Sequence, residues 1–362
     1  MRSSHRWRAS LLVGALALSG CGFYSVASVS GQDLGAGLAT PAENGAKLVS
    51  TAFANRVPTE QEIDTPVLVA VHGFSATTFE TMYGTGTAPQ EANAPYNLER
   101  RGLLVSRVLM GGHNETPAAF GASRWSDWQK PVLDEVQALQ KLGFRKIDIL
   151  TVSTGGPIVM QALLSGKFKA LGVTPRRVTL VAPILEFKDK AINLLGVLET
   201  LGASNSPSPT SGVSRGHWYA DRPIGAVKQL LDLTEVVKGQ LRQVSAGTLD
   251  GVPAETRVLI VQSDGDGTVD AVSADIWVRG LRGKIADTTQ AAGLVSVLKV
   301  VSSRHVPIGP PNLEGSKDGT RSIDGIVHPT FADAKGADAW SDAEVRLRVR
   351  LLEQIGDFHT AK

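Results

Sequence analysis

The sequence predicts an α/β fold with a mostly parallel central sheet and helices on both of its faces. Runs of branched apolar residues that suit buried strands recur along the chain, and segments with helical spacing separate them. The clearest strand runs are 66–71, 103–110, 147–152, 177–184, 257–262 and 295–301. Strand–helix–strand units of this kind favour parallel pairing. A chain of 362 residues is long enough for one large α/β domain.

The fold is organised around the stretch 147–164, in which a strand turns into a helix at one serine. The strand ends at Ser153, and the helix that follows carries Pro157 in its first turn. The motif Thr151-x-Ser153-x-Gly155 resembles the G-x-S-x-G nucleophile elbow of the α/β-hydrolases, with threonine where the first glycine is expected. An elbow exposes the serine hydroxyl at the carboxyl end of the sheet. Ser153 is therefore the predicted nucleophile.

The strand 66–71 leads into His72-Gly73-Phe74, which resembles the oxyanion loop of the same family. The resemblance implies that the backbone amides of Phe74 and Thr154 form the oxyanion hole and that His72 orients the loop. After the next strand, the turn around His113 resembles a turn of the monoglyceride lipases, so this histidine is interpreted as a turn residue.

Asp266-Gly267-Thr268-Val269 follows the strand 257–262 and resembles the acid turn of the family, so Asp266 is the predicted acid of a catalytic triad. Asp264 and Asp270 are close competitors. The turn also contains an Asp-Gly-Asp-Gly run, but it lacks the spaced ligands and closing glutamate of an EF-hand. No metal site is therefore expected.

His305 comes shortly after the last clear strand, in a loop that resembles the one carrying the catalytic histidine of the family. It is the predicted general base. His328 is a weaker rival, because it lies well beyond that strand in a region that reads as irregular. The order Ser153, Asp266, His305 is the order of the α/β-hydrolase triad.

Residues 185–256 are expected to form a cap, inserted before the strand that carries the acid. They contain a flexible stretch at 204–212 and an amphipathic helix at 224–244, but no strand comparable to the others. A closing helix is expected at 339–355. Several apolar cap residues could contact an acyl group or merely pack the cap on the body: Leu194, Leu195, Val197, Leu198 and Trp218.

The N-terminus has the layout of a secretory signal, with arginines, a short apolar run and then small residues. The ending Leu18-Ser19-Gly20-Cys21 resembles the bacterial lipobox, which implies a lipoprotein signal peptide at 1–20 and a lipidated Cys21. Residues 21–46 would be a tether, and 47–362 the hydrolase domain. Gly22 in place of aspartate favours the outer membrane of the cell envelope. The alternative is a plain signal or anchor helix with an incidental cysteine.

The resemblance is closest to the carboxylesterase and monoglyceride-lipase branch, which includes serine aminopeptidase-like proteins. It implies a serine hydrolase that cleaves small or lipid-derived carboxylic esters through an acyl-enzyme, without a cofactor. One alternative uses the same triad on an amide, a peptide or a transferred acyl group. Another is a lipoprotein that keeps the scaffold and only binds ligands. The formal net charge of +2, with three arginines inside the first eight residues, gives no reason to expect nucleic acid.

Overall fold

The computed structural model describes residues 41–190, 192, 205–207, 217–219, 221–283, 294–302, 304–315, 319–331 and 339–361. The predicted signal peptide and Cys21 lie outside the described residues, as do Leu194, Leu195, Val197 and Leu198. The lipid anchor therefore stays a prediction. Within the described part of the chain, no helix has both the length and the apolar character needed to cross a bilayer.

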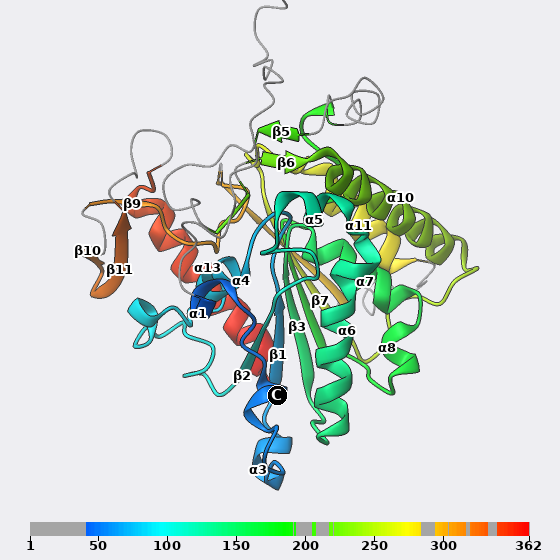
Figure 1. The fold of residues 1–362 in the computed structure, drawn as a ribbon, viewed down its shortest axis with the longest axis horizontal. Helices are drawn as coiled ribbons and strands as arrows, with labels where there is room; N and C mark the ends of the chain where they lie inside the picture. Colours follow the sequence, from blue (N-terminus) through cyan, green and yellow to red (C-terminus); the bar gives the residue numbers. More distant parts are fainter. Residues whose placement is uncertain are drawn as a thin grey trace, which may run out of the picture.

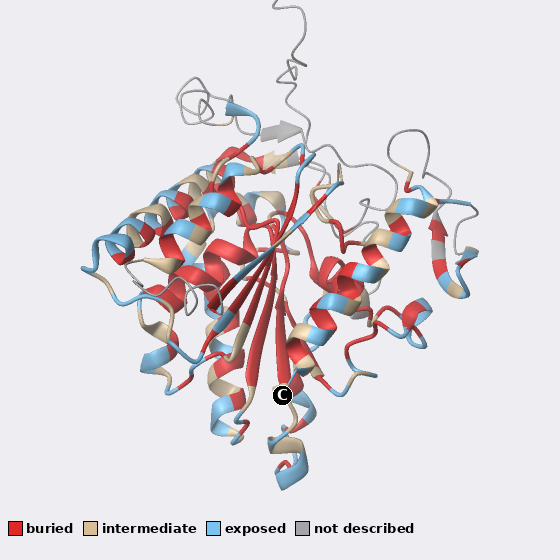
Figure 2. Cartoon of the chain, turned by 180° about the vertical axis from the view of Figure 1, so that it is seen from behind, coloured by how far each residue is buried: buried red, intermediate tan, exposed pale blue. Residues whose placement is uncertain are grey.

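A six-stranded sheet forms the centre of the molecule, and all of its neighbouring strands pair in parallel (Figure 1). The predicted α/β fold with a parallel sheet is thus confirmed. In spatial order the strands are β2 (Leu104–Val108), β1 (Val67–Val71), β3 (Ile147–Val152), β4 (Arg177–Val181), β7 (Arg257–Ser263) and β8 (Val295–Val300). Strands β1 and β3 are buried along their whole length, as Figure 2 shows for the middle of the sheet.

Helices cover both faces of this sheet, and successive strand residues point into two separate cores. In β1, for example, Val67 and Val69 pack in one core, whereas Leu68 packs in the other. The first core is closed by α6 (Trp125–Lys141), α7 (Gly155–Leu164), α10 (Ile224–Ala246) and α11 (Val272–Arg282). The second is closed mainly by α13 (Asp342–Thr360), the expected C-terminal helix.

Shorter elements surround this body. They include α1 (Pro41–Asn44), α2 (Val49–Ala52), α3 (Glu60–Ile63), α4 (Thr78–Gly84), η1 (Pro89–Glu91), α5 (Pro117–Ala122) and α8 (Lys167–Ala170). Two small sheets complete them, one of β5 (Asn205–Pro207) and β6 (Asp221–Pro223), the other of β9 (Leu313–Glu314), β10 (Gly319–Ile323) and β11 (Ile326–Phe331).

Two boundaries differ from the sequence prediction. Asn44 is buried and accepts a hydrogen bond from Thr77 Oγ1 at 3.0 Å, so the folded domain begins before residue 47. The helix expected in the cap is α10, which packs against α7 and α11 in the layer that covers the sheet (Figure 1). Leu230, Leu233 and Val237 of α10 are buried there. The stretch 224–246 is therefore part of the body.

Candidate active site

Ser153 lies at the sharp turn between β3 and α7, at the carboxyl end of the sheet. Its φ of 48° falls in the left-handed region that non-glycine residues rarely adopt, and its amide donates to Val181 O at 2.8 Å. Two glycines make the turn possible. A Cβ on Gly155 would lie 2.8 Å from Val71 O, and a Cβ on Gly156 would lie 2.8 Å from Pro183 Cβ. The local sequence thus allows the strained conformation expected of an elbow.

Thr151 replaces the first glycine of the elbow motif without crowding the turn. The side chain is fully buried, and Oγ1 donates to Thr179 O on β4 at 3.2 Å. The facing position on α7 is Gly156, whose ideal Cβ would lie 3.7 Å from Thr151 Oγ1, an ordinary van der Waals distance. The threonine therefore fits beside the helix and adds a hydrogen bond between neighbouring strands.

We expect Thr151→Gly, which restores the usual motif, to lower the free energy of unfolding by about 1–3 kcal/mol. Glycine costs strand stability, and the buried hydroxyl bond is lost. Urea denaturation measures the change. Thr151→Val is the matched control, because it keeps the branched side chain and loses only the hydroxyl, so it should cost about 1 kcal/mol. A Thr151→Gly protein more stable than the wild type would show that threonine is strained here.

The structure brings Ser153, Asp266 and His305 together. His305 Nε2 lies 2.9 Å from Ser153 Oγ, and His305 Nδ1 lies 2.8 Å from Asp266 Oδ2. The other carboxylate oxygen of Asp266 accepts from the amides of Thr268 and Val269 at 2.7 and 2.9 Å. Asp266 is 1% exposed, so its carboxylate is held by its own turn and directed at the imidazole.

The rival residues lie elsewhere. Asp264 is exposed, and Asp270 Oδ1 accepts from the Val272 amide at the start of α11 at 3.1 Å. His328 lies in strand β11, not in an irregular segment as expected, and its Nδ1 is 3.8 Å from the buried Glu91. In the described part of the chain, no three histidine, cysteine or acidic side chains gather in a metal-binding arrangement.

The loop after β1 lies directly against the elbow. A Cβ built on Gly73 would be 3.2 Å from Ser153 Cβ, so the loop passes close to the side chain of the serine. Thr154 is the N-cap of α7, where helix amides are free to bind a negative charge. The two residues predicted to donate to an oxyanion, Phe74 and Thr154, directly follow Gly73 and Ser153, the residues that approach each other here.

His72 holds this loop in the manner expected from the sequence. Its ring donates from Nδ1 to Gly73 O at 2.9 Å and accepts at Nε2 from Met110 N at 3.0 Å. These two partners fix a neutral tautomer, and burial lowers its pKa to about 4. His113 is likewise buried, bonds to Gly111 O at 3.2 Å and packs edge-on against His72.

Glu80 is a buried acid beside the site that the sequence analysis missed. It belongs to the first turn of α4, is 4% exposed, and accepts a hydrogen bond at Oε2 from Gly73 N at 2.6 Å. Burial raises the pKa of the Glu80 carboxyl to about 7, against the opposing effects of the Gly73 amide and of His305. An acid at the start of a helix is ordinary in sequence, which gives no signal of burial.

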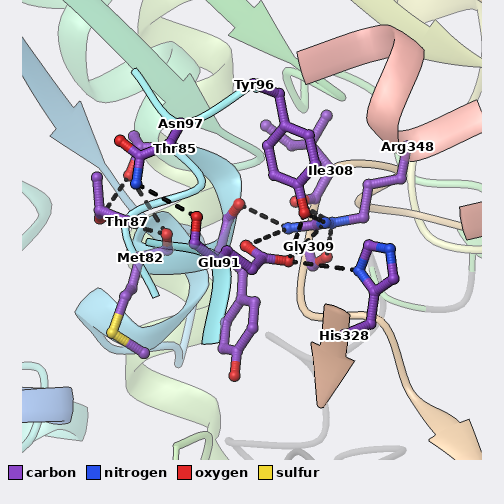
Figure 3. Close-up of polar contacts among 11 residues, drawn as sticks. Met82, Thr85, Thr87, Glu91, Tyr96, Asn97, Ile308, Gly309, His328 and Arg348 are labelled. Atoms are coloured by element: carbon purple, nitrogen blue, oxygen red, sulfur yellow. Dashed lines mark hydrogen bonds and ion pairs between the residues drawn. The ribbon is translucent and has the colours of Figure 1, made fainter. Parts of the chain in front are cut away.

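A buried ion pair anchors the loop that follows His305 (Figure 3). Arg348 of α13 pairs with both oxygens of Glu91 at 2.8 and 3.0 Å, and its Nε donates to Gly309 O at 2.8 Å. Arg348 also donates to Tyr83 O at 2.8 Å, and to Tyr96 Oη and Ile308 O, each at 3.3 Å. Burial disfavours the charge of the Glu91 carboxyl, but Arg348 outweighs it and keeps the pKa below the usual value.

Of the predicted cap contacts, Trp218 is the one described by the structure. It is partly buried and packs edge-on against Phe79 of α4 at a ring distance of 6.2 Å. The neighbouring Tyr219 donates its amide to Ser75 O in the oxyanion loop at 3.1 Å. The segment 217–219 thus lies against the loop and α4, close to the site.

Among known proteins, this chain is similar to solved structures but not to any family model or curated sequence. A structure titled for LipS and LipT, two metagenome-derived lipolytic enzymes, is 20% identical with a TM-score of 0.51, over 67% of this chain and 86% of that one. A soluble variant of monoglyceride lipase from Saccharomyces cerevisiae is 11% identical with a TM-score of 0.51, over 85% and 90%.

These similar structures are α/β-hydrolases, and this chain has the α/β-hydrolase fold, as the sequence predicted. At such low identities the likeness concerns the fold. The reaction therefore has to be inferred from the residues of the site.

Proposed function

We propose that this protein is a serine hydrolase that cleaves carboxylic esters through an acyl-enzyme, with Ser153 as nucleophile, His305 as general base and Asp266 as the acid. The observation that carries the proposal is the placement of the His305 ring, 2.9 Å from Ser153 Oγ and 2.8 Å from Asp266 Oδ2. A base between a hydroxyl and a buried carboxylate is the arrangement that activates serine.

The chemistry follows from these contacts. His305 Nε2 takes the hydroxyl proton as Ser153 Oγ bonds to the carbonyl carbon, and Asp266 stabilises the imidazolium. The amides of Phe74 and Thr154 bind the oxyanion, which contributes about 3 kcal/mol or more to the barrier reduction. The intermediate collapses, and His305 gives its proton to the departing alcohol. Water then attacks the acyl group, His305 takes a proton from it, and the acid leaves as Ser153 Oγ is protonated again.

Esters are the proposed substrate class because the similar structures include lipolytic enzymes and a monoglyceride lipase. The fold supports other acyl transfers, so this choice is the part of the proposal that a substrate panel must decide. We infer small or lipid-derived esters, whose acyl group would lie near the aromatic side chains of Phe79 and Trp218.

The test is covalent labelling. Purified protein treated with a fluorophosphonate should take up one label per chain, and peptide mass spectrometry should locate it on Ser153. The labelled protein should also lose hydrolysis of p-nitrophenyl esters of increasing chain length. Absence of both label and turnover would favour a binding protein on a hydrolase scaffold. Label with peptide cleavage but no ester turnover would favour a peptidase.

A further inference from the structure

We propose that Glu80 is a positioning residue for this reaction: its carboxylate holds the oxyanion loop through Gly73 N, and its charge supports the imidazolium of His305. The inference rests on the proposed function. Three observations carry it. They are the contact of Glu80 with the loop, its place beside Ser153, and the lack of a paired lysine or arginine among the described residues.

The contact of Glu80 is with the backbone that precedes a predicted oxyanion donor. Glu80 Oε2 lies 2.6 Å from Gly73 N, a short distance typical of a charge-assisted bond. The next amide in the chain is that of Phe74. Glu80 thus fixes the N–H of Gly73, while His72 Nδ1 holds Gly73 O, the carbonyl that shares a planar peptide unit with Phe74 N. Glu80 therefore holds the loop at the Gly73 amide, while His72 ties the loop to Met110 N, just after β2.

The carboxylate also lies beside the nucleophile. A Cβ on Gly73 would be 3.1 Å from Glu80 Oε2 and 3.2 Å from Ser153 Cβ, so both groups border the same point. A side chain at position 73 would crowd both groups, so Gly73 allows Glu80 and Ser153 to approach the loop from two directions.

No lysine or arginine in the described part of the chain forms an ion pair with Glu80, although the carboxyl is buried. Such a group is costly to keep charged unless a positive charge arises nearby. His305, whose Nε2 lies 2.9 Å from Ser153 Oγ, is the group whose positive charge would act on Glu80. The imidazole becomes positive only while Ser153 attacks and the tetrahedral intermediate breaks down. A carboxylate here therefore has a stronger attraction to His305 in the transition state than in the resting enzyme.

Other titratable groups around Glu80 are accounted for. Asp266 faces His305 from the opposite ring nitrogen. His72 of the loop is neutral because burial lowers its pKa to about 4, and burial does the same to His217, which stacks on Phe79 beside Glu80. Glu43 of α1 contacts α4 through its backbone carbonyl, which accepts from Thr78 Oγ1.

Glu80→Gln separates the two parts of the role, because the amide can still accept from Gly73 N but carries no charge. We expect kcat for p-nitrophenyl ester hydrolysis to fall about tenfold with little change in KM, because the lost interaction acts in the transition state. Thermal unfolding should show no loss of stability, because a buried charge has been removed. A purely structural role would instead lower stability and leave kcat unchanged.

The pH dependence gives the second readout. The acid limb of kcat/KM should move to lower pH in Glu80→Gln, because the positively charged form of the base loses a nearby negative charge. The wild-type profile should bend at two pKa values, one of them belonging to Glu80 near 7, and the variant profile at one. Asp264→Asn is the matched control, since it removes an exposed charge from the acid turn and should leave the profile unchanged.

The outcomes separate this inference from the proposed function. If the fluorophosphonate labels both wild type and Glu80→Gln, and the two proteins have the same kcat and pH profile, the role of Glu80 is wrong. The proposed serine hydrolase function would still stand. Absence of label in both proteins would remove the proposed function and this inference with it. If Glu80→Gln does not fold, the wild-type profile decides alone, because a single ionisation on the acid limb contradicts the coupling.

Discussion

Replacing Ser153 by alanine is expected to lower kcat for ester hydrolysis by about three to six orders of magnitude. Without Oγ there is no atom to form the acyl-enzyme, and His305 Nε2 loses the hydroxyl that lies 2.9 Å away. The remaining rate would come from binding and from the oxyanion amides, which act on direct attack by water. The fluorophosphonate label should disappear completely.

Ser165→Ala is the matched control, because it removes an exposed serine from the other end of the same helix. It should retain wild-type kcat and labelling. Both variants should unfold at nearly the same temperature as the wild type, because Ser153 Oγ contributes a hydrogen bond only to the site. Ester turnover by Ser153→Ala above about one tenth of the wild-type rate would rule out Ser153 as the nucleophile.

The sequence predicted the parts of the site that follow strands. Ser153, Asp266 and His305 each come just after a strand of the parallel sheet, and the carboxyl ends of parallel strands meet at one edge. Their order and the turns around them resembled a known family. Local pattern and sheet topology therefore favoured these residues, but the choice of Asp266 over Asp264 needed the structure, in which Asp264 is exposed and Asp266 contacts His305.

The sequence could not predict the residues that act from helices. Glu80 reads as a helix-start acid, and Arg348 reads like its neighbours Arg346 and Arg350 in a charged amphipathic segment. Arg348 is nevertheless fully buried against Glu91, whereas Arg346 forms an exposed pair with Asp324. Tertiary packing decides which of these similar arginines is buried. The periodicity of a single helix carries no information about that packing.

The cap illustrates the same limit on a larger scale. An apolar stripe predicted the helix at 224–244 correctly, and α10 spans Ile224–Ala246. The pattern could not predict whether the apolar face of this helix packs against the helices that cover the sheet or over the active site. Its contacts with α7 and α11 make it a body helix.

The second large effect is expected for Arg348→Met, which should lower the free energy of unfolding by about 3–5 kcal/mol. Methionine fills the space of the arginine stem but leaves the carboxylate of Glu91 buried without its partner, and an uncompensated buried charge has about this cost. The Gly309 carbonyl also loses its donor. Urea denaturation at neutral pH measures the difference. Arg346→Met is the matched control, and loss of its exposed pair should change the free energy of unfolding far less, because solvent screens the two charges.

The double variant Glu91→Gln/Arg348→Met tests the physical reason for that loss. It removes both charges, so it should be more stable than Arg348→Met alone, although it still lacks the anchor on the loop 305–309. If the loop has to be anchored for His305 to reach Ser153, the double variant should recover stability without recovering kcat. A double variant as unstable as Arg348→Met would show that the hydrogen bonds of Arg348 to the backbone, and not its charge on Glu91, hold this part of the fold.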